Sequence, residues 1–496
     1  MKQLSYQTLR GVGHEDYLLE QAPEKVIQFG EGNFLRGFAD AFLDVLNEKT
    51  GLDAKVVLVQ PVGRKDHTEA FRKQDGLYTL YLRGFENGER VNRKRIISCV
   101  SRCLNPYAHY DEILACAENP ALRYIISNTT EAGIVYDPTC QLEDAPPQAF
   151  PAKLTQFLYR RFQAVGAQGD GFVILPCELI DDNGKVLRHC VEQYISQWKL
   201  EPAFLWWVEE KNVFCSTLVD RIVTGYPAGE VARLQEENGY EDALLDTGEV
   251  FAFWAIEGPE WLKKELRFEE AGLPVVVTAD CKPYKERKVR ILNGAHTSMV
   301  LGAFLAGEDI VRDCMEDEVI CGFMKKALYD EILPTLTLPR EELLQFTGSV
   351  VERFRNPFID HKLLSISLNS TAKWKARILP SLLDAVKLTG KVPACLAASF
   401  AFYLLFYHGD KLGENGLEAT YNGRSYTIVD DRQVLAFFYQ HRDTPMAELA
   451  LAAMSRTDFW GCDLTRIAGF ADAVLHCLES VEKTDIKAVM KELAEA

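Results

Sequence analysis

The chain has 496 residues, too many for one ordinary hydrophobic core, so we expect two or three domains. Hydrophobic residues make up 47% of it and charged residues 26%, as in a soluble globular protein. The formal net charge of −17 disfavours nucleic acid or an anionic membrane as a partner. An anionic substrate would therefore need a locally positive site.

The cysteines and the apolar runs of the sequence predict a cytoplasmic protein without a membrane span. The 13 cysteines are scattered without a C-x-x-C pair, which predicts reduced thiols in a cytoplasm. The first residues, MKQLSYQTLRGVGHEDY, lack the apolar segment of a signal peptide. The longest apolar run, Ala394 to Tyr407, is too short to cross a bilayer and predicts a buried helix.

The first predicted strand leads into a glycine turn. Residues 1–24 are polar and are expected to lie on the surface, and residues 25–29 form a short apolar strand. Gly30 and Gly32 follow, and then a helical pattern begins. Such glycines let a backbone approach a pyrophosphate, whose charge the helix N-terminus favours. Leu35 stands in place of the third fingerprint glycine, so a plain tight turn fits the pattern equally well.

A second strand, residues 55–59, ends at Gln60. An acidic residue here would bind the adenine-ribose hydroxyls and indicate NAD. Gln60 is not acidic, and Arg64 and Lys65 lie just beyond it, which leaves NADP open.

Further strands complete the pattern of an α/β domain. A hairpin is predicted around Asn87-Gly88, and a buried strand over residues 122–127. The polar residues after that strand could line a nicotinamide, since ligands bind beyond the C-terminal ends of parallel strands. These residues are Asn128, Thr129, Thr130 and Glu131. Alternatively, Asn128 or Thr130 begins the next helix as its N-cap.

Later strands are predicted over residues 171–175, 253–257 and 274–278, and a loop over residues 136–150. From Pro283 onward the pattern is mostly helical. The sequence thus predicts an α/β chain. A Rossmann-like dinucleotide-binding domain (1–280) is followed by a mainly α-helical substrate domain (281–496), with the chemistry between them.

Lys288, Asn293 and His296 stand at the start of the second part. At about 100° per residue, Asn293 lies about 140° and His296 about 80° from Lys288 on an α-helix, so all three could face one site. A lysine transfers protons near neutral pH when burial or nearby positive charge lowers its pKa. Lys285, Arg287 and Arg290 supply that charge, and an amide and an imidazole can hold an alkoxide and a hydroxyl. A basic amphipathic helix without catalytic function has the same composition.

The stretch KVRILNGAH, which contains all three residues, resembles the signature of the long-chain mannitol dehydrogenase family. Its members are polyol and sugar-acid dehydrogenases that use nicotinamide and need no metal. The resemblance implies that Lys288 is the general acid/base and that Asn293 and His296 bind the reacting oxygen and substrate hydroxyls. Several stretches look closest to the branch that acts on tagaturonate, a keto sugar acid, with NAD.

The cofactor-binding segments resemble the same family. Its G-x-G-x-F-x-R pattern is matched by Gly30, Gly32, Phe34 and Arg36, with Asn33 inside it. SNTTEAG, residues 127–133, is similar to the family's T-x-T-E-G segment. The family's C-D-N segment appears here as Cys177-Glu178-Leu179, so the second oxyanion amide is missing from its usual place. Either Asn183 or another donor replaces it, or polarisation rests mainly on Asn293.

Two basic residues are expected to bind an acidic substrate. RFRNP and STAKWKAR resemble further family segments, and the family carries a lysine at the position of Lys373. Arg377 shares a helical face with it, though it fits a solvated surface equally well. Mannitol dehydrogenases have an acid at the position of Lys285, one helical turn before Lys288. A base there suits a sugar acid.

The predicted reaction is reversible hydride transfer between NADH and a keto sugar acid. Fructuronate or a neutral polyol such as mannitol are alternatives within the family. A non-catalytic sugar-acid sensor and a 6-phosphogluconate-type enzyme are alternatives of other kinds. No metal is implied, because no histidine–carboxylate cluster has metal-ligand spacing.

Overall fold

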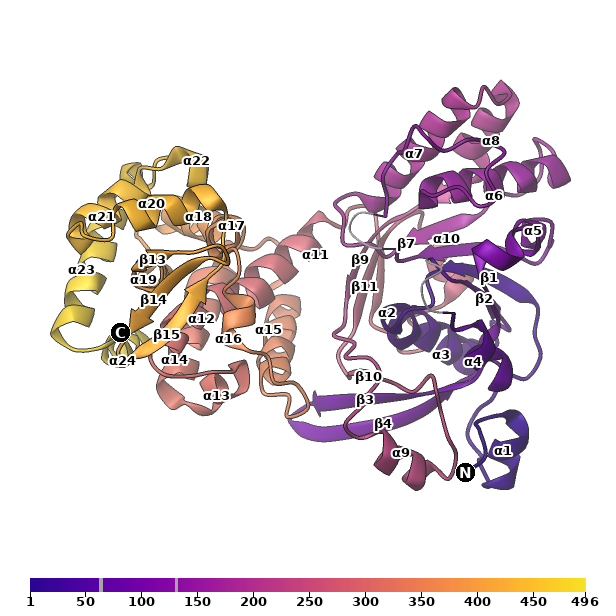
Figure 1. Cartoon of the computed structure of the whole chain (residues 1–496), viewed down its shortest axis with the longest axis horizontal. Helices are drawn as coiled ribbons and strands as arrows, with labels where there is room; N and C mark the ends of the chain where they lie inside the picture. Colours follow the sequence, from indigo (N-terminus) through magenta and orange to yellow (C-terminus); the bar gives the residue numbers. More distant parts are fainter. Residues whose placement is uncertain (62–65, 130–132) are drawn as a thin grey trace. The chain divides into compact units, whose positions relative to one another are not determined.

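The computed structural model describes residues 1–61, 66–129 and 133–496. They form two compact units (Figure 1). The N-terminal unit comprises Met1–Gly84 and Glu89–Cys281, and the C-terminal unit comprises Phe85–Gly88 and Lys282–Ala496. Four residues singled out from the sequence lie outside the described residues: Arg64, Lys65, Thr130 and Glu131.

A six-stranded sheet organises the N-terminal unit. Its strands are β1 (Glu24–Phe29), β2 (Lys55–Val59), β5 (Val100–Leu104), β6 (Tyr124–Ser127), β7 (Val173–Pro176) and β8 (Val213–Phe214). The order is β5-β2-β1-β6-β7-β8, and all neighbours are parallel. Counted along the chain without the hairpin strands, this is the 3-2-1-4-5-6 order of a doubly wound sheet. The predicted Rossmann-like fold is confirmed.

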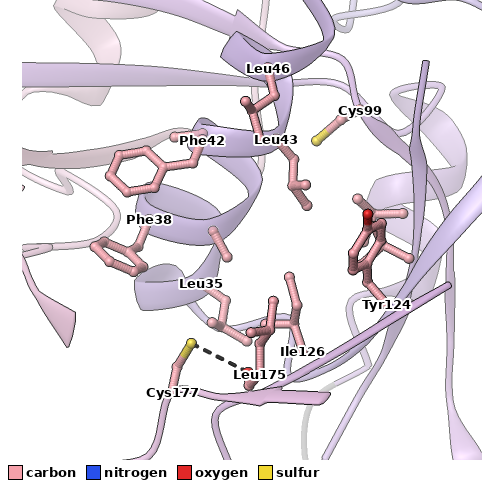
Figure 2. Close-up of a cluster of buried hydrophobic side chains, with 14 of the residues drawn as sticks. Leu35, Phe38, Phe42, Leu43, Leu46, Cys99, Tyr124, Ile126, Leu175 and Cys177 are labelled. Carbon is pink, nitrogen blue, oxygen red and sulfur yellow. Dashed lines mark hydrogen bonds between the residues drawn. The ribbon is translucent and has the colours of Figure 1, made fainter. Parts of the chain in front are cut away.

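The strands are apolar throughout because both faces of the sheet are covered. Val26 and Leu58 point into one core with the helical segment after Gly32, which ends in α3 (Ala41–Thr50). Ile27 and Val59 point into the other core. The helices on that side are α5 (Pro106–Cys116), α6 (Phe150–Val165), α7 (Asn183–Gln197) and α8 (Pro202–Lys211). Figure 2 shows part of the first core, where the helical segment packs with sheet residues.

Two smaller sheets belong to the same unit. The predicted hairpin is present as β3 (Tyr78–Glu86) and β4 (Glu89–Ile97), with β10 (Asp246–Glu249) parallel to β3. Asn87 and Gly88 both have positive φ, of 54° and 80°, as a type I′ turn requires. The other sheet contains β9 (Ser216–Asp220), β11 (Phe253–Glu257) and β12 (Val275–Thr278).

Two expectations about this unit are wrong. The N-terminal segment does not only cover the surface, because Leu4, two residues before α1 (Tyr6–Gly11), and Leu9 within α1 are buried. Asn128 is not the N-cap of a helix either. Within the described part of the chain, the next helix after β6 begins at Phe150. The remaining helices of the unit are α2 (Asn33–Leu35), α4 (Thr68–Lys73), α9 (Val231–Asn238) and α10 (Trp261–Leu266).

The C-terminal unit is mainly helical, as predicted. Its first helices are α11 (Lys282–Arg287), α12 (Gly294–Leu305), α13 (Val311–Glu316), α14 (Glu318–Lys326), α15 (Arg340–Phe354), α16 (Leu363–Ile366), α17 (Ser370–Arg377) and α18 (Leu379–Thr389). They are followed by α19 (Ala394–Phe406), α20 (Arg432–Gln440), α21 (Met446–Met454), α22 (Thr457–Trp460), α23 (Phe470–Lys483) and α24 (Ile486–Glu495).

The centre of this unit is α12, every residue of which is buried. It packs on α19, the helix predicted from the long apolar run, and the rings of Phe304 and Phe406 lie 5.8 Å apart. Gly302 permits this approach, because a Cβ there would lie 2.5 Å from the Phe402 ring. No helix in the described part of the chain is long and apolar enough to cross a membrane.

One small sheet in this unit was not predicted. It contains β13 (Lys411–Leu412), β14 (Leu417–Tyr421) and β15 (Arg424–Ile428), paired antiparallel. The turn between β14 and β15 is Asn422-Gly423, with φ of 47° and 78°. This is the hairpin signal already used for Asn87-Gly88.

Candidate active site

The glycine turn lies where the strand order of the main sheet reverses, between β1 and β6. Gly30 has φ +136°, and a Cβ there would lie 2.9 Å from the Asn128 backbone oxygen, so only glycine fits. Gly32 precedes an unbroken helical segment that runs from Asn33 through Thr50, and nothing lies within 4 Å of its added Cβ. No side chain caps this N-terminus. Open space and uncapped N–H groups suit a pyrophosphate.

Arg36 does not fit the predicted role in cofactor binding. Its side chain is 6% exposed and lies over the Tyr78 ring, 5.1 Å from the centroid. The guanidinium donates to the Leu244 carbonyl oxygen and, at 2.5 Å, to the Asn33 Oδ1 atom. Its charge also opposes the effect of burial, which raises the pKa of Asp40 to about 7. Arg36 therefore links the helical segment after the glycine turn to the Leu244 backbone and the Tyr78 ring.

Its neighbours in the motif, Phe34 and Asn33, also contact other parts of the N-terminal unit. Phe34 is half-buried and stacks on Phe38, with ring centroids 5.2 Å apart. The side-chain amide of Asn33 lies beside Gly225, whose φ is +82° and whose added Cβ would meet the Asn33 Nδ2 atom at 2.2 Å. Within the motif, Gly32 and Asn33 are exposed, and the space beside Gly32 is open.

The C-terminal end of β2 is tied to the glycine turn. Gln60 is buried, and its Oε1 atom accepts a hydrogen bond of 3.3 Å from the His67 backbone N–H. The His67 Nδ1 atom lies 3.2 Å from a carboxylate oxygen of Glu31, which stands between the two glycines. A buried carboxylate thus lies near the strand end where the sequence shows no acidic residue.

The C-terminal ends of β6 and β7 are joined through Glu178. Its buried carboxylate accepts hydrogen bonds from the Ser127 hydroxyl at 3.0 Å and from the Thr129 backbone N–H at 3.0 Å. The Asn128 side chain donates to the Cys177 carbonyl oxygen at 2.8 Å. This bracing places Asn128 and Thr129 at the sheet edge where the cofactor was predicted.

Asn183 does not replace the missing amide. It is fully buried, and its Nδ2 atom donates to the carbonyl oxygens of Pro176 at 2.9 Å and Glu178 at 3.0 Å. Its Oδ1 atom accepts from the backbone N–H groups of Gly184 at 2.9 Å and Thr217 at 2.8 Å. Both ends of the amide are occupied by backbone partners, so Asn183 has a structural role.

We expect Asn183→Ala to lower the free energy of unfolding by about 1–3 kcal/mol, because it leaves buried backbone groups unsatisfied. Thermal and urea unfolding would measure the loss, and Gln163→Ala, at an exposed amide on α6, is the control. A raised substrate KM with unchanged stability would instead restore the substrate-binding role.

Lys288 and Asn293 are the ends of a π-helical segment, Lys288–Asn293, between α11 and α12. The angles expected for an α-helix therefore do not apply. Hydrogen bonds from residue i to i+5 bring residues five apart closer to one face of the helix, and such segments are frequent at functional sites. Lys288 and Asn293 are half-buried. Lys285, which is half-buried as well, lies on α11 one helical turn before Lys288.

Two of the basic residues expected to act on Lys288 have counter-ions. Arg287 is paired with Glu342 at 2.6 Å and lies over the Phe346 ring at 4.3 Å. Arg290 is paired with Asp384, also at 2.6 Å. The first pair joins the end of α11 to α15, and the second joins the π-helical segment to α18.

His296 is 8% exposed on α12 and stacks on Phe354, with ring centroids 4.1 Å apart. Within the described residues, its Nε2 atom is buried and has no hydrogen-bond partner. Burial, and then the neighbouring His361 and Arg377 side chains, lower its pKa well below the ordinary value. A neutral imidazole with an unused buried nitrogen can orient a substrate hydroxyl.

Four basic side chains lie near enough to His296 to lower its pKa, and we call them the basic cluster. Its members are His361, Lys373, Arg377 and Arg353. They come from the segment after α15, from α17 and from the end of α15, and Figure 1 shows α12, α16 and α17 close together in the C-terminal unit. The sequence predicted Lys373 as a substrate ligand and left two roles open for Arg377. It gave no signal for His361.

In the described part of the chain, no group of three or more His, Cys, Asp or Glu side chains could hold a metal ion. All 13 cysteines are unpaired in the structure.

Comparison with known proteins identifies the family. Residues 24–270 match the mannitol dehydrogenase Rossmann domain, and residues 280–482 match the mannitol dehydrogenase C-terminal domain. The chain belongs to the mannitol dehydrogenase family. Named relatives within it include an altronate oxidoreductase of Pectobacterium carotovorum, 47% identical over 479 residues, covering 95% of this chain and 97% of that one. That of Escherichia coli K12 is 45% identical over 493 residues, covering 98% and 100%.

Solved structures of the family share the fold. Mannitol 2-dehydrogenase of Pseudomonas fluorescens, in a ternary complex with NAD and D-mannitol, is similar with a TM-score of 0.68 and 23% identity, covering 100% of both chains. A D-sorbitol dehydrogenase in substrate-free form gives a TM-score of 0.78 and 23% identity, covering 98% of this chain and 100% of that one.

Proposed function

We propose that this chain is an NAD-dependent tagaturonate reductase, or altronate oxidoreductase, which interconverts a keto sugar acid and its alcohol. The names of its relatives, at 45–48% identity over nearly the whole chain, support this reaction. The observation that carries an acidic substrate is the basic cluster around His296, in a chain whose net charge is −17. A sugar-acid anion is repelled by the chain as a whole and needs such a cluster.

The residues of the π-helical segment and of α12 would perform the proton chemistry. NADH, when bound, supplies the hydride for the carbonyl carbon. Lys288 would donate a proton to the developing alkoxide, while the Asn293 amide stabilises its charge. His296 would orient a neighbouring hydroxyl through its unpaired nitrogen. Lys373 and Lys285 would bind the substrate carboxylate, and residues 281–496 would form the substrate domain.

The N-terminal unit, within the proposed cofactor domain of residues 1–280, has features that fit a dinucleotide. Gly30 leaves no room for a Cβ, whereas Gly32 opens onto free space before an uncapped helix. The backbone from Gly30 to Phe34 would bind the pyrophosphate. Gln60, Asn128 and Thr129 would lie along the ribose and nicotinamide, with Thr130 and Glu131 continuing that segment.

We expect NADH to be preferred over NADPH, against the hint from Gln60 and Arg64. The Glu31 carboxylate, paired to His67 at 3.2 Å, would repel a 2′-phosphate near the end of β2. The ratio of kcat/KM for the two cofactors measures the preference, and fluorescence titration of each reduced cofactor measures affinity independently of turnover. Glu31→Gln should narrow the gap in both measurements. A higher kcat/KM with NADPH in the wild-type enzyme would overturn the assignment and make Arg64 the candidate ligand of the 2′-phosphate.

The proposed function is tested by assaying purified enzyme with tagaturonate, fructuronate and fructose, each with NADH. Fastest reduction of tagaturonate is expected. Faster turnover of fructuronate or fructose would favour the other activities predicted within the family, and binding without turnover would favour a sensor. We also propose a cytoplasmic location, since the 13 unpaired thiols suit a reducing compartment.

A further inference from the structure

Arg377 is a charged group with few partners of its own. It is half-buried on α17, and burial lowers its pKa. Its guanidinium makes one long hydrogen bond, of 3.5 Å, to the Thr297 hydroxyl. Among the described residues, no carboxylate forms an ion pair with it. A guanidinium has five N–H donors in a fixed fork, so most of its binding capacity is unused.

Lys373, one helical turn earlier, is in a similar state. Its ammonium donates to the Ile366 carbonyl oxygen at 2.7 Å, and burial together with Arg377 lowers its pKa. Asp430 attracts Lys373, but its Oδ2 atom already accepts hydrogen bonds from the Thr371 hydroxyl and from the Tyr407 hydroxyl. Asp430 is therefore committed to other partners, and the two cations share no counter-ion in the described residues.

His361 completes the arrangement on the side of His296. Its ring meets the His296 ring edge-on, with centroids 5.3 Å apart and an interplanar angle of 86°. Its backbone is fixed, since the His361 carbonyl oxygen accepts from the Val311 backbone N–H at 3.0 Å. Burial, and then the charge of Lys373, lower the pKa of His361. The neutral form of an imidazole offers one N–H donor.

We propose that Arg377 and His361, together with Lys373, bind the substrate carboxylate beside His296 and make the enzyme select a sugar acid over a neutral sugar. This inference rests on the proposed function and assigns two specificity-determining residues to it. A carboxylate can accept two parallel hydrogen bonds from Arg377 and further ones from Lys373 and His361. It would also neutralise charges that are otherwise desolvated without a partner, an unfavourable state.

The test compares an acid and a neutral substrate in matched variants. Arg377→Met should lower the ratio of kcat/KM for tagaturonate over fructose by about 10-fold or more, and His361→Asn should lower it several-fold. Lys375→Met and His476→Asn, at exposed positions in the same unit, are the controls and should leave the ratio unchanged. Arg377→Lys, which keeps the charge but loses the fork, should fall between wild type and Arg377→Met.

Binding of a hexuronate without a reacting keto group, D-galacturonate, separates this inference from the proposed function. Calorimetry of the wild-type enzyme should detect binding that Arg377→Met weakens about 10-fold or more. If the wild type binds galacturonate in this way but does not reduce tagaturonate, the proposed reaction fails while the carboxylate site stands. Equal losses on acid and neutral substrates in folded Arg377→Met and His361→Asn, or unweakened galacturonate binding, would overturn the site.

Discussion

Replacing Lys288 by alanine is expected to lower the rate of reduction by about 10²–10⁴, the usual contribution of a general acid/base. Without the ammonium, the developing alkoxide must take its proton from water. The loss should appear in kcat under saturating substrate, measured by NADH consumption at neutral pH. NADH affinity, measured by fluorescence titration, should be nearly unchanged, because the proposed pyrophosphate site is built from Gly30 and Gly32 on a different element.

Lys375→Ala is the matched control, because it removes an exposed lysine from the same unit. It should retain wild-type turnover. A small primary amine added to the Lys288→Ala enzyme should restore part of the lost rate, which a purely structural role for Lys288 would not predict. Wild-type turnover in Lys288→Ala at neutral pH would show that another group transfers the proton.

The Rossmann-like sheet was predictable because each of its strands has a recognisable pattern within a few consecutive residues. Parallel strands covered on both faces read as short apolar runs, and the runs ending at Phe29, Val59 and Ser127 became β1, β2 and β6. The hairpin was predictable from Asn87-Gly88 for the same reason, since two successive positive φ values demand such residues. The hairpin at Asn422-Gly423 carries an equal signal, but it stands within a part of the chain whose pattern is otherwise mostly helical.

The candidate site was predictable only in part. The spacing of Lys288, Asn293 and His296 placed them on one helix, but not the π-helical segment, which propensity does not indicate. His361 lies 65 positions after His296 by residue number and reaches it only through tertiary packing, so no local pattern reveals it.

Two side chains chosen from the sequence as site residues are directed at groups of the protein itself, because residue type and position in the chain do not fix the direction of a side chain. Arg36 belongs to the glycine motif, yet its guanidinium turns back to the Leu244 carbonyl and the Tyr78 ring. Asn183 was chosen for its chemistry, yet its amide is occupied by the backbone at the ends of β7 and β9. Both residues hold the backbone of the protein in place through these contacts.

The second large effect is expected from removing a lysine proposed to bind the substrate carboxylate. A carboxylate paired to a lysine gains a charge-assisted hydrogen bond of about 1.5–3 kcal/mol, so Lys373→Met should lower kcat/KM for tagaturonate by roughly 10–150-fold. The same change should have little effect on kcat/KM for fructose, which has no carboxylate.

Lys285→Met, tested separately, should also reduce the difference in kcat/KM between tagaturonate and fructose, whereas Lys375→Met should not. His296 is buried, and burial is the largest cause that lowers its pKa, ahead of the charge of Lys373. If Lys373→Met and Lys285→Met each lose activity equally on tagaturonate and fructose, neither lysine binds the carboxylate, and Arg377 and His361 would have to do so without them.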